Sequence, residues 1–218
     1  MTIEPYFSGD GVTIYHGDCV DVLPHLGRFD LLLTDPPYGL RWRGTGFTRH
    51  TKILDHNKAK RWDVRPSSQA MGLALGVSSR FIVWGGNYLS DMLPPCRGPL
   101  VWDKQTGANT FADGELAFNN VCETMRIFRH QWCGAFKASE RKATPIHDTQ
   151  KPLALMRWCL SLCDGVKTVV DPFMGSGTTL EAARLYGMRA VGIDADESCC
   201  EKAAKRLSQG LLGFIGDA

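Results

Sequence analysis

The chain has 218 residues, of which 44% are hydrophobic and 22% charged, and its formal net charge is +2. This length and composition suit one ordinary hydrophobic core rather than two full domains. No apolar run reaches the roughly 20 residues that span a bilayer, and residues 1–11 lack the features of a signal peptide, so we exclude membrane, coiled-coil, collagen-like and disordered classes and expect a cytoplasmic protein.

The N-terminal half contains apolar runs that predict buried strands. Phe29–Thr34 is one such run and ends at an aspartate, and Arg80–Trp84 is another and ends at a Gly-Gly pair. Between residues 99 and 136 the pattern changes to shorter strand-like runs, at 100–102 and 124–128. We expect this region to form the less regular end of one sheet together with an insertion.

The C-terminal third alternates strands and helices. Residues 167–171 predict a buried parallel strand, 178–186 a helix, 189–193 a second strand and about 196–207 a second helix. This order indicates a right-handed crossover connection. We therefore predict an α/β fold with a doubly wound, mostly parallel sheet and helices on both faces.

The cysteine and histidine patterns argue against a metal site. The chain has eight cysteines and six histidines, but no C-x-x-C pair and no H-x-x-x-H spacing, which zinc sites commonly use. A disulfide scaffold would be shorter and richer in loops. We expect reduced, mostly buried thiols and no bound metal.

Basic and aromatic residues are interleaved after residue 40. Such a stretch suits a phosphate backbone with stackable bases, and a solvated loop explains the composition equally well. Trp42, Phe47 and Trp62 are the aromatic members. The candidate nucleic-acid contacts are Arg41, Arg43, Arg49, Lys52, Lys58, Lys60 and Arg61.

A glycine-containing turn follows the strand predicted at 167–171. It reads Asp171-Pro-Phe-Met-Gly-Ser-Gly-Thr-Thr179, and its two glycines allow the backbone to approach a ligand closely. The third glycine of a dinucleotide fingerprint and the lysine of a Walker motif are both missing. Asp194 comes 19 residues after Gly175, at the end of the next strand, where a carboxylate can bind ribose hydroxyls. The turn therefore predicts a nucleoside ligand without a pyrophosphate, and a tight turn beside an exposed carboxylate is the alternative.

The sequence Asp35-Pro-Pro-Tyr38 follows the strand predicted at 29–34. The prolines fix φ and lack N–H groups, so a carboxylate and a carbonyl are free to accept the two hydrogens of one amino group. The tyrosine ring offers a face for stacking of a heterocycle. Hydrogen bonds to both hydrogens favour an sp3-like nitrogen that can attack a methyl group. The alternative is an acidic turn that ends a strand.

Together these motifs resemble the β-class DNA amino-methyltransferases, which use S-adenosylmethionine. The catalytic motif, Asp35–Tyr38, precedes the cofactor motif, Phe173–Gly177, in the permuted order of that class. His147–Pro152 resembles the family's HPTQKP segment, with Asp148 in place of its first proline, and Tyr15–Asp18 resembles its N-terminal segment. The resemblance covers most of the chain and implies a Rossmann-like methyltransferase fold in a single domain, residues 1–218. The least constrained parts, 41–79 and 104–146, are expected to be insertions that contact DNA and recognise the target.

The resemblance also implies roles for individual residues. The Asp35 carboxylate and the Pro36 carbonyl would bind the target amino group, and Tyr38 would stack on a flipped base. Asp194 would hold the ribose, Asp18 would contact the adenine edge, and Lys151 would pair with the methionine carboxylate. The catalytic set is Asp35, Pro36, Pro37 and Tyr38, and the cofactor set is Asp18, His147, Thr149, Gln150, Lys151, Asp171, Phe173, Gly175, Ser176, Gly177, Thr178 and Asp194.

The resemblance leaves several alternatives open. Relatives that modify cytosine N4 tend to carry Ser at the first catalytic position, so Asp35 favours adenine N6. An N4-cytosine enzyme, an amino-methyltransferase acting on RNA or on glutamine, and a non-catalytic DNA-binding subunit remain alternatives. Double-stranded DNA and a second copy of the chain are the expected partners, in a bacterial or phage setting. Glu115 could accept a hydrogen bond from a base or cap a turn, and the sequence does not decide between these roles.

Overall fold

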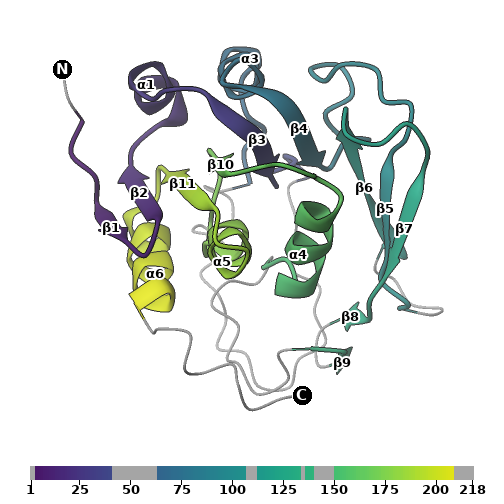
Figure 1. The fold of residues 1–218 in the computed structure, drawn as a ribbon. Coiled ribbons are helices and arrows are strands. Elements are labelled where there is room, and N and C mark those ends of the chain that lie inside the picture. The colour runs from purple at the N-terminus through teal and green to yellow at the C-terminus, as the bar shows by residue number, and fades with distance from the viewer. Residues whose placement is uncertain (1–2, 41–62, 107–111, 134–135, 140–149, 209–218) are drawn as a thin grey trace.

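The structure, a computed structural model, describes residues 3–40, 63–106, 112–133, 136–139 and 150–208 (Figure 1). Its main element is a nine-stranded sheet with the order β1-β2-β11-β10-β3-β4-β6-β5-β7, and β8 and β9 form a separate pair. In chain order the elements are β1 (Phe7–Gly9), β2 (Val12–His16), α1 (Cys19–Val22), the 3-10 turn η1 (Leu23–His25), β3 (Phe29–Thr34), α3 (Ser68–Gly76), β4 (Ser78–Trp84), β5 (Leu100–Asp103), β6 (Gly114–Asn119), β7 (Arg126–Arg129), β8 (Trp132–Cys133), β9 (Phe136–Lys137), α4 (Leu153–Ser161), β10 (Thr168–Asp171), α5 (Thr178–Leu185), β11 (Arg189–Asp194) and α6 (Glu197–Ser208).

Five adjacent strands, β2, β11, β10, β3 and β4, form the parallel part of the sheet. Parallel strands are buried on both faces and therefore need continuous apolar runs. Leu31, Leu32 and Leu33 of β3 meet this requirement, since none of them is exposed. The predicted α/β fold with a doubly wound, mostly parallel sheet is confirmed.

Helices cover both faces of the sheet (Figure 1). On one face α1 and α3 bury Val22, Met71 and Ala74 against the strands. On the other face α4, α5 and α6 form a larger core that includes Leu155 and Leu180. Helix α3 lies in the second half of the expected 41–79 insertion, where it forms the crossover from β3 to β4. No helix within the described ranges has the length and apolar character that crossing a membrane requires.

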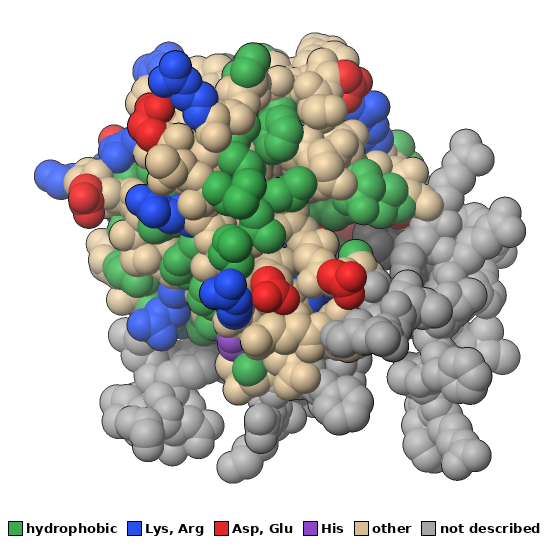
Figure 2. All heavy atoms as spheres, turned by 90° about the vertical axis from the view of Figure 1, so that its right-hand side faces the viewer, with side chains coloured by type: hydrophobic (Ala, Val, Ile, Leu, Met, Phe, Trp, Pro, Cys, Tyr) green, Lys and Arg blue, Asp and Glu red, His purple; other side chains and the backbone are tan. Residues whose placement is uncertain are grey.

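One end of the sheet is mixed, because β6 runs antiparallel to both β4 and β5. This reversal brings the start of β6 and the end of β5 to the edge at which β3 and β4 end. The free edge of this part is β7, where Met125 is 55% and Ile127 is 47% exposed. Figure 2 shows hydrophobic side chains gathered across this side of the molecule, with charged side chains around them.

The parallel strands β10 and β3 are the point at which the crossover connections change direction across the sheet. The crossover from β3 leads to β4 on one side, and the crossover from β10 leads to β11 on the other. In doubly wound sheets the crevice at the carboxyl ends of such a strand pair is where ligands bind. The ends of β3 and β10 carry the two sequence motifs, Asp35–Tyr38 and Asp171–Gly177.

Gly192 in β11 should be required for the packing of α5 on the sheet. A Cβ at this position would lie 2.5 Å from Met174 Sδ and 2.7 Å from Leu180 Cδ2. We expect Gly192→Ala to lower the free energy of unfolding by about 1–3 kcal/mol, because the buried neighbours must shift. Urea denaturation measures this change.

Gly72→Ala is the matched control. Gly72 lies inside α3 and is exposed, and a Cβ there would meet no atom within 4 Å. Alanine should therefore leave stability unchanged or raise it by up to about 1 kcal/mol, as helix propensity dictates. Equal effects of the two substitutions would contradict the packing argument.

Candidate active site

The conformation of the turn after β10 depends on two glycines with positive φ and on one carboxylate. Gly175 and Gly177 adopt positive φ angles of 51° and 76°, which favour glycine. Asp194 Oδ2, at the end of the adjacent strand β11, accepts the N–H of Gly175 at 2.9 Å. A Cβ on Gly175 would meet no atom within 4 Å, whereas one on Gly177 would lie 3.0 Å from Ala203 Cβ. Gly175 therefore faces open space at the strand ends, and Gly177 packs against α6.

Asp171 joins the two motifs. Its Oδ1 accepts the hydroxyl of Thr34, the last residue of β3, at 2.6 Å and the N–H of Phe173 at 3.1 Å. The side chain is buried, and burial raises the pKa of Asp171 from 3.8 to about 6 although the hydroxyls of Thr34 and Thr179 oppose the shift. Asp171 thus fixes the turn after β10 relative to the end of β3.

Other members of the predicted cofactor set lie in different environments. Asp18 follows β2, beside the end of β11, where its side chain is exposed and caps α1 by accepting the N–H of Val20. Ser176 and Thr178 are buried, their hydroxyl oxygens lie 3.4 Å apart, and Arg206 donates to Thr178 at 3.1 Å. Their hydroxyls therefore bond within the protein.

The Asp35–Tyr38 motif takes part in a compact polar cluster at the end of β3. Tyr38 Oη donates to Asp35 Oδ1 at 2.5 Å, and Lys151 Nζ lies 2.5 Å from Asp35 Oδ2. Lys151 directly precedes the proline that caps α4, and its side chain is only 9% exposed. Both oxygens of the Asp35 carboxylate are thus engaged. The sequence expectation placed Lys151 on a cofactor carboxylate, and the structure places its ammonium on Asp35.

Glu115 and Lys104 complete this cluster. Glu115 Oε2 lies 3.0 Å from Lys151 Nζ and 3.2 Å from Tyr38 Oη, and Glu115 Oε1 lies 2.5 Å from Lys104 Nζ. Glu115 reaches the site because β6 runs antiparallel to β4, and Lys104 reaches it because it follows β5. The sequence left the role of Glu115 open, and Lys104 is the first residue of the 104–146 region that was expected to contact DNA. The positions of Lys104 and Glu115 in the sequence do not predict that they pair with each other.

The pKa values of Asp35 and Glu115 are shifted in opposite directions. Burial raises the pKa of both groups, but Lys151 and Lys104 together outweigh it at Glu115 and lower the pKa of that side chain to about 2. Among the described residues Asp35 contacts one ammonium, that of Lys151, and burial together with the Glu115 charge raises the pKa of Asp35 above the ordinary value. The pKa of Lys151 is also raised, since the two carboxylates outweigh the effect of burial. Glu115 is therefore the permanent anion of the cluster.

The ring of Tyr38 is fixed by its neighbours. It stacks on Tyr88 with ring centroids 5.1 Å apart and an interplanar angle of 26°. It also lies against Gly85, which has a φ of 75° and whose Cβ, if present, would overlap the ring. Gly85, the first of the two glycines after β4, thus leaves the space that the Tyr38 ring occupies.

Several predicted residues fall outside the described residues. These are the basic candidates Arg41, Arg43, Arg49, Lys52, Lys58, Lys60 and Arg61, and the cofactor candidates His147 and Thr149. Gln150 is described and half-buried beside Lys151. The seven cysteines whose side chains are described are free thiols, as expected, and five of them are buried.

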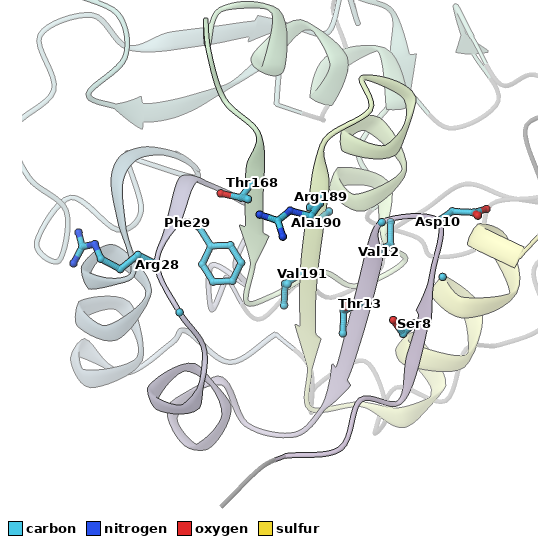
Figure 3. A pocket seen from close by; sticks show the side chains of 13 residues that line it. Ser8, Asp10, Val12, Thr13, Arg28, Phe29, Thr168, Arg189, Ala190 and Val191 are labelled. Atoms are coloured by element: carbon cyan, nitrogen blue, oxygen red, sulfur yellow. The ribbon is translucent and has the colours of Figure 1, made fainter.

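A separate cavity of about 480 Å³ lies at the amino ends of the parallel strands (Figure 3). Its lining includes Phe29, Thr168 and Arg189, the first residues of β3, β10 and β11. The motifs lie at the carboxyl ends of the same strands. This cavity is therefore distinct from the candidate active site.

Comparison with known proteins agrees with this geometry. Residues 101–205 match the model of a family described as DNA methylase. The Type II methyltransferase M2.MboI of Moraxella bovis is 25% identical over 261 aligned positions, which cover 94% of this chain and 92% of that protein. These similarities support the resemblance to the S-adenosylmethionine-dependent DNA amino-methyltransferases. The Asp35–Tyr38 motif precedes the 173–177 turn in the sequence, in the order that the resemblance to the β class implies.

Solved structures of such enzymes share the fold. The M1.HpyAVI complex with S-adenosylmethionine superposes with a TM-score of 0.57 and 20% identity, over 90% of this chain and 100% of that chain. The PvuII DNA methyltransferase, described as cytosine-N4-specific, gives a TM-score of 0.61 and 13% identity, over 95% of this chain and 90% of that chain. The Rossmann-like methyltransferase fold expected from the resemblance is confirmed.

Ionisation of Asp171 should destabilise the folded protein. The pKa of Asp171 is about 6 in the folded protein, against an ordinary value of 3.8, so between these pH values the folded state holds a proton that the unfolded state has lost. Stability contributed by this group therefore falls as pH rises from about 4 to 6, by roughly 3 kcal/mol in total.

Asp171→Asn removes this ionisation and keeps an oxygen that can accept from Thr34 and Phe173. We expect the stability of the variant relative to wild type to rise as pH increases from 4.5 to 7. Urea denaturation at both pH values measures the difference. A constant difference would show that Asp171 titrates normally.

Proposed function

We propose that the protein transfers a methyl group from S-adenosylmethionine to the exocyclic N6 of adenine in DNA. The observation that carries this proposal is the position of Asp35–Tyr38 beside the 173–177 turn, at the switch point of one sheet. An acid-Pro-Pro-Tyr sequence there offers acceptors for an amino group next to a nucleoside site. Asp at the first position of the motif favours adenine.

The strand ends fit the cofactor. Gly175 leaves space for it, Asp194 and Asp18 lie on neighbouring strand ends where ribose and adenine need acceptors, and Phe173 is half-buried in the same turn. Asp194 already accepts the N–H of Gly175, and a carboxylate oxygen can accept a further bond from a ribose hydroxyl. When bound, S-adenosylmethionine supplies an activated methyl group on a sulfonium centre that leaves as a neutral thioether.

The residues of the chain orient the target base and stabilise charge. Asp35 and the carbonyl of Pro36 accept the two amino hydrogens, which positions the nitrogen lone pair for in-line attack. The nitrogen becomes positively charged as it gains the methyl group, and the Asp35 carboxylate stabilises that charge. The Tyr38 ring stacks on the base, which is flipped out of the duplex at a cost of a few kcal/mol.

Cytosine N4 is the second candidate acceptor. It is supported by the likeness in fold to the PvuII enzyme, whose description names cytosine N4, and by the common chemistry of the two amino groups. DNA contact by the basic residues of 41–61 stays a prediction. A homodimer also stays a prediction, supported by the exposed Met125 and Ile127 at the free edge of the sheet, and the mass of the protein in solution tests it.

The deciding experiment identifies the labelled nucleoside. Purified protein is incubated with methyl-labelled S-adenosylmethionine and unmethylated duplex DNA, and the DNA is digested to nucleosides. We expect label in N6-methyladenine. Label in N4-methylcytosine would replace the base assignment, and label only in parallel samples with RNA would replace the substrate.

Asp35→Ala is the matched variant for that assay. It removes the acceptor but leaves the cofactor turn intact, so we expect less than a few percent of wild-type transfer with unchanged binding of S-adenosylmethionine. Retention of more activity would exclude Asp35 as the group that binds the target amino group.

Gly175→Ala tests the position of the cofactor. The added methyl group would enter the open space above the turn, so we expect the dissociation constant for S-adenosylmethionine to rise at least tenfold in calorimetry. Gly187→Ala is the control, because Gly187 also has a positive φ, of 68°, and open space, but follows the opposite end of α5. Similar dissociation constants for the two variants would contradict the assigned site.

A further inference from the structure

The Asp35 carboxylate is covered in this structure. Tyr38 donates to one of its oxygens and Lys151 Nζ lies 2.5 Å from the other. The target amino group needs the same carboxylate as its acceptor. Each Asp35 oxygen can accept one further hydrogen bond, but the amino group would then share the carboxylate with an ammonium group.

Of the two donors, Lys151 is the more important one to move away from Asp35, because it is charged. Methyl transfer moves a positive charge onto the amino nitrogen, and Asp35 can stabilise that charge only if its own charge is not already neutralised. An ammonium 2.5 Å from Asp35 would repel the nitrogen at close range. A buried ammonium without an anion is itself costly, so Lys151 needs another partner when it leaves Asp35.

Glu115 offers this partner to both donors. Its Oε2 lies 3.0 Å from Lys151 Nζ and 3.2 Å from Tyr38 Oη. We propose that Glu115 is a positioning residue that takes Lys151 and the Tyr38 hydroxyl from Asp35 when the target base binds. This inference rests on the proposed transfer of a methyl group to an amino nitrogen.

Lys104 and Lys151 keep the Glu115 carboxylate in place and ionised. Lys104 holds its other oxygen, Oε1, at 2.5 Å, so the carboxylate stays in place while Oε2 accepts a second donor. Its side chain is 15% exposed, and the two lysines hold its pKa near 2, which keeps it charged at all working pH values. The exchange needs only small movements, because Lys151 and Tyr38 already lie within contact distance of Oε2.

Among the described residues, Glu115 is the carboxylate besides Asp35 that forms an ion pair with Lys151. Asp171 also lies near Asp35, but its Oδ1 is occupied by Thr34 and Phe173. Glu115 is thus the acceptor that leaves Asp35 free and keeps Lys151 paired.

Glu115→Gln tests the proposal, because it keeps the shape of the side chain and removes its charge. Lys151 should then remain on Asp35. We expect kcat for methyl transfer to fall at least tenfold at saturating DNA and cofactor, with less than a threefold change in the dissociation constant for S-adenosylmethionine. Glu123→Gln is the control, since Glu123 forms an exposed ion pair with Arg97, and it should match wild type.

A double-mutant cycle separates this role from a structural one. In a Lys151→Met background there is no ammonium to remove from Asp35, so Glu115→Gln should cost less than threefold in kcat. An equal loss in both backgrounds, or wild-type kcat for Glu115→Gln alone, would overturn the proposal.

Titration of the Lys151 ammonium by NMR gives a readout that does not depend on activity. Loss of one of its two anions should lower the pKa of Lys151 in Glu115→Gln and leave it unchanged in Glu123→Gln. An unchanged pKa in Glu115→Gln would also overturn the proposal. Absence of methyl transfer by the wild-type protein, with the shift in pKa present, would instead contradict the proposed function alone.

Discussion

The hydrogen bond from Thr34 to Asp171 joins the two halves of the candidate site. It links the last residue of β3 to the last residue of β10 across the switch point, at 2.6 Å and in a buried position. The same carboxylate oxygen accepts the N–H of Phe173. One buried acid therefore fixes the turn proposed for the cofactor relative to the motif proposed for the target base. Transfer of a group between two ligands depends on such fixed geometry.

The charge cluster around Asp35 follows from this arrangement. Two carboxylates and two ammonium groups lie together at one sheet edge, where burial strengthens their interactions. Glu115 contacts both lysines and Asp35 contacts one, so the charges are balanced without being shared equally. This asymmetry leaves Asp35 as the acceptor whose partners can change.

Glycines place the aromatic and cofactor surfaces at the same edge. Gly85 gives the Tyr38 ring its place against the backbone, and Gly192 lets Met174 and Leu180 pack on β11. A Cβ at either position would overlap these side chains and displace them. The fold thus builds the site by close packing beneath it as much as by the polar groups on its surface.

The sequence by itself determined the α/β class, most of the strands and C-terminal helices, and the two motifs with their order. These features depend on local patterns: the leucine run of β3, the β-branched run of β10, and the glycines that follow it. In the main sheet the strands β1, β2 and β6 were not predicted, and neither were the helices α1, α3 and α4. Strand β6 reads as Gly-Glu-Leu-Ala without alternation, and α3 is short and consists mostly of small residues.

Only the tertiary structure decided which charged groups meet. Lys151 pairs with Asp35 and Glu115, and Glu115 pairs with Lys104. Glu115 and Lys104 reach this site because the antiparallel β6 and the end of β5 lie at the edge where β3 ends. A local pattern records which residues follow a strand. It does not record the direction in which a distant strand pairs, because that direction is set by the packing of the whole sheet.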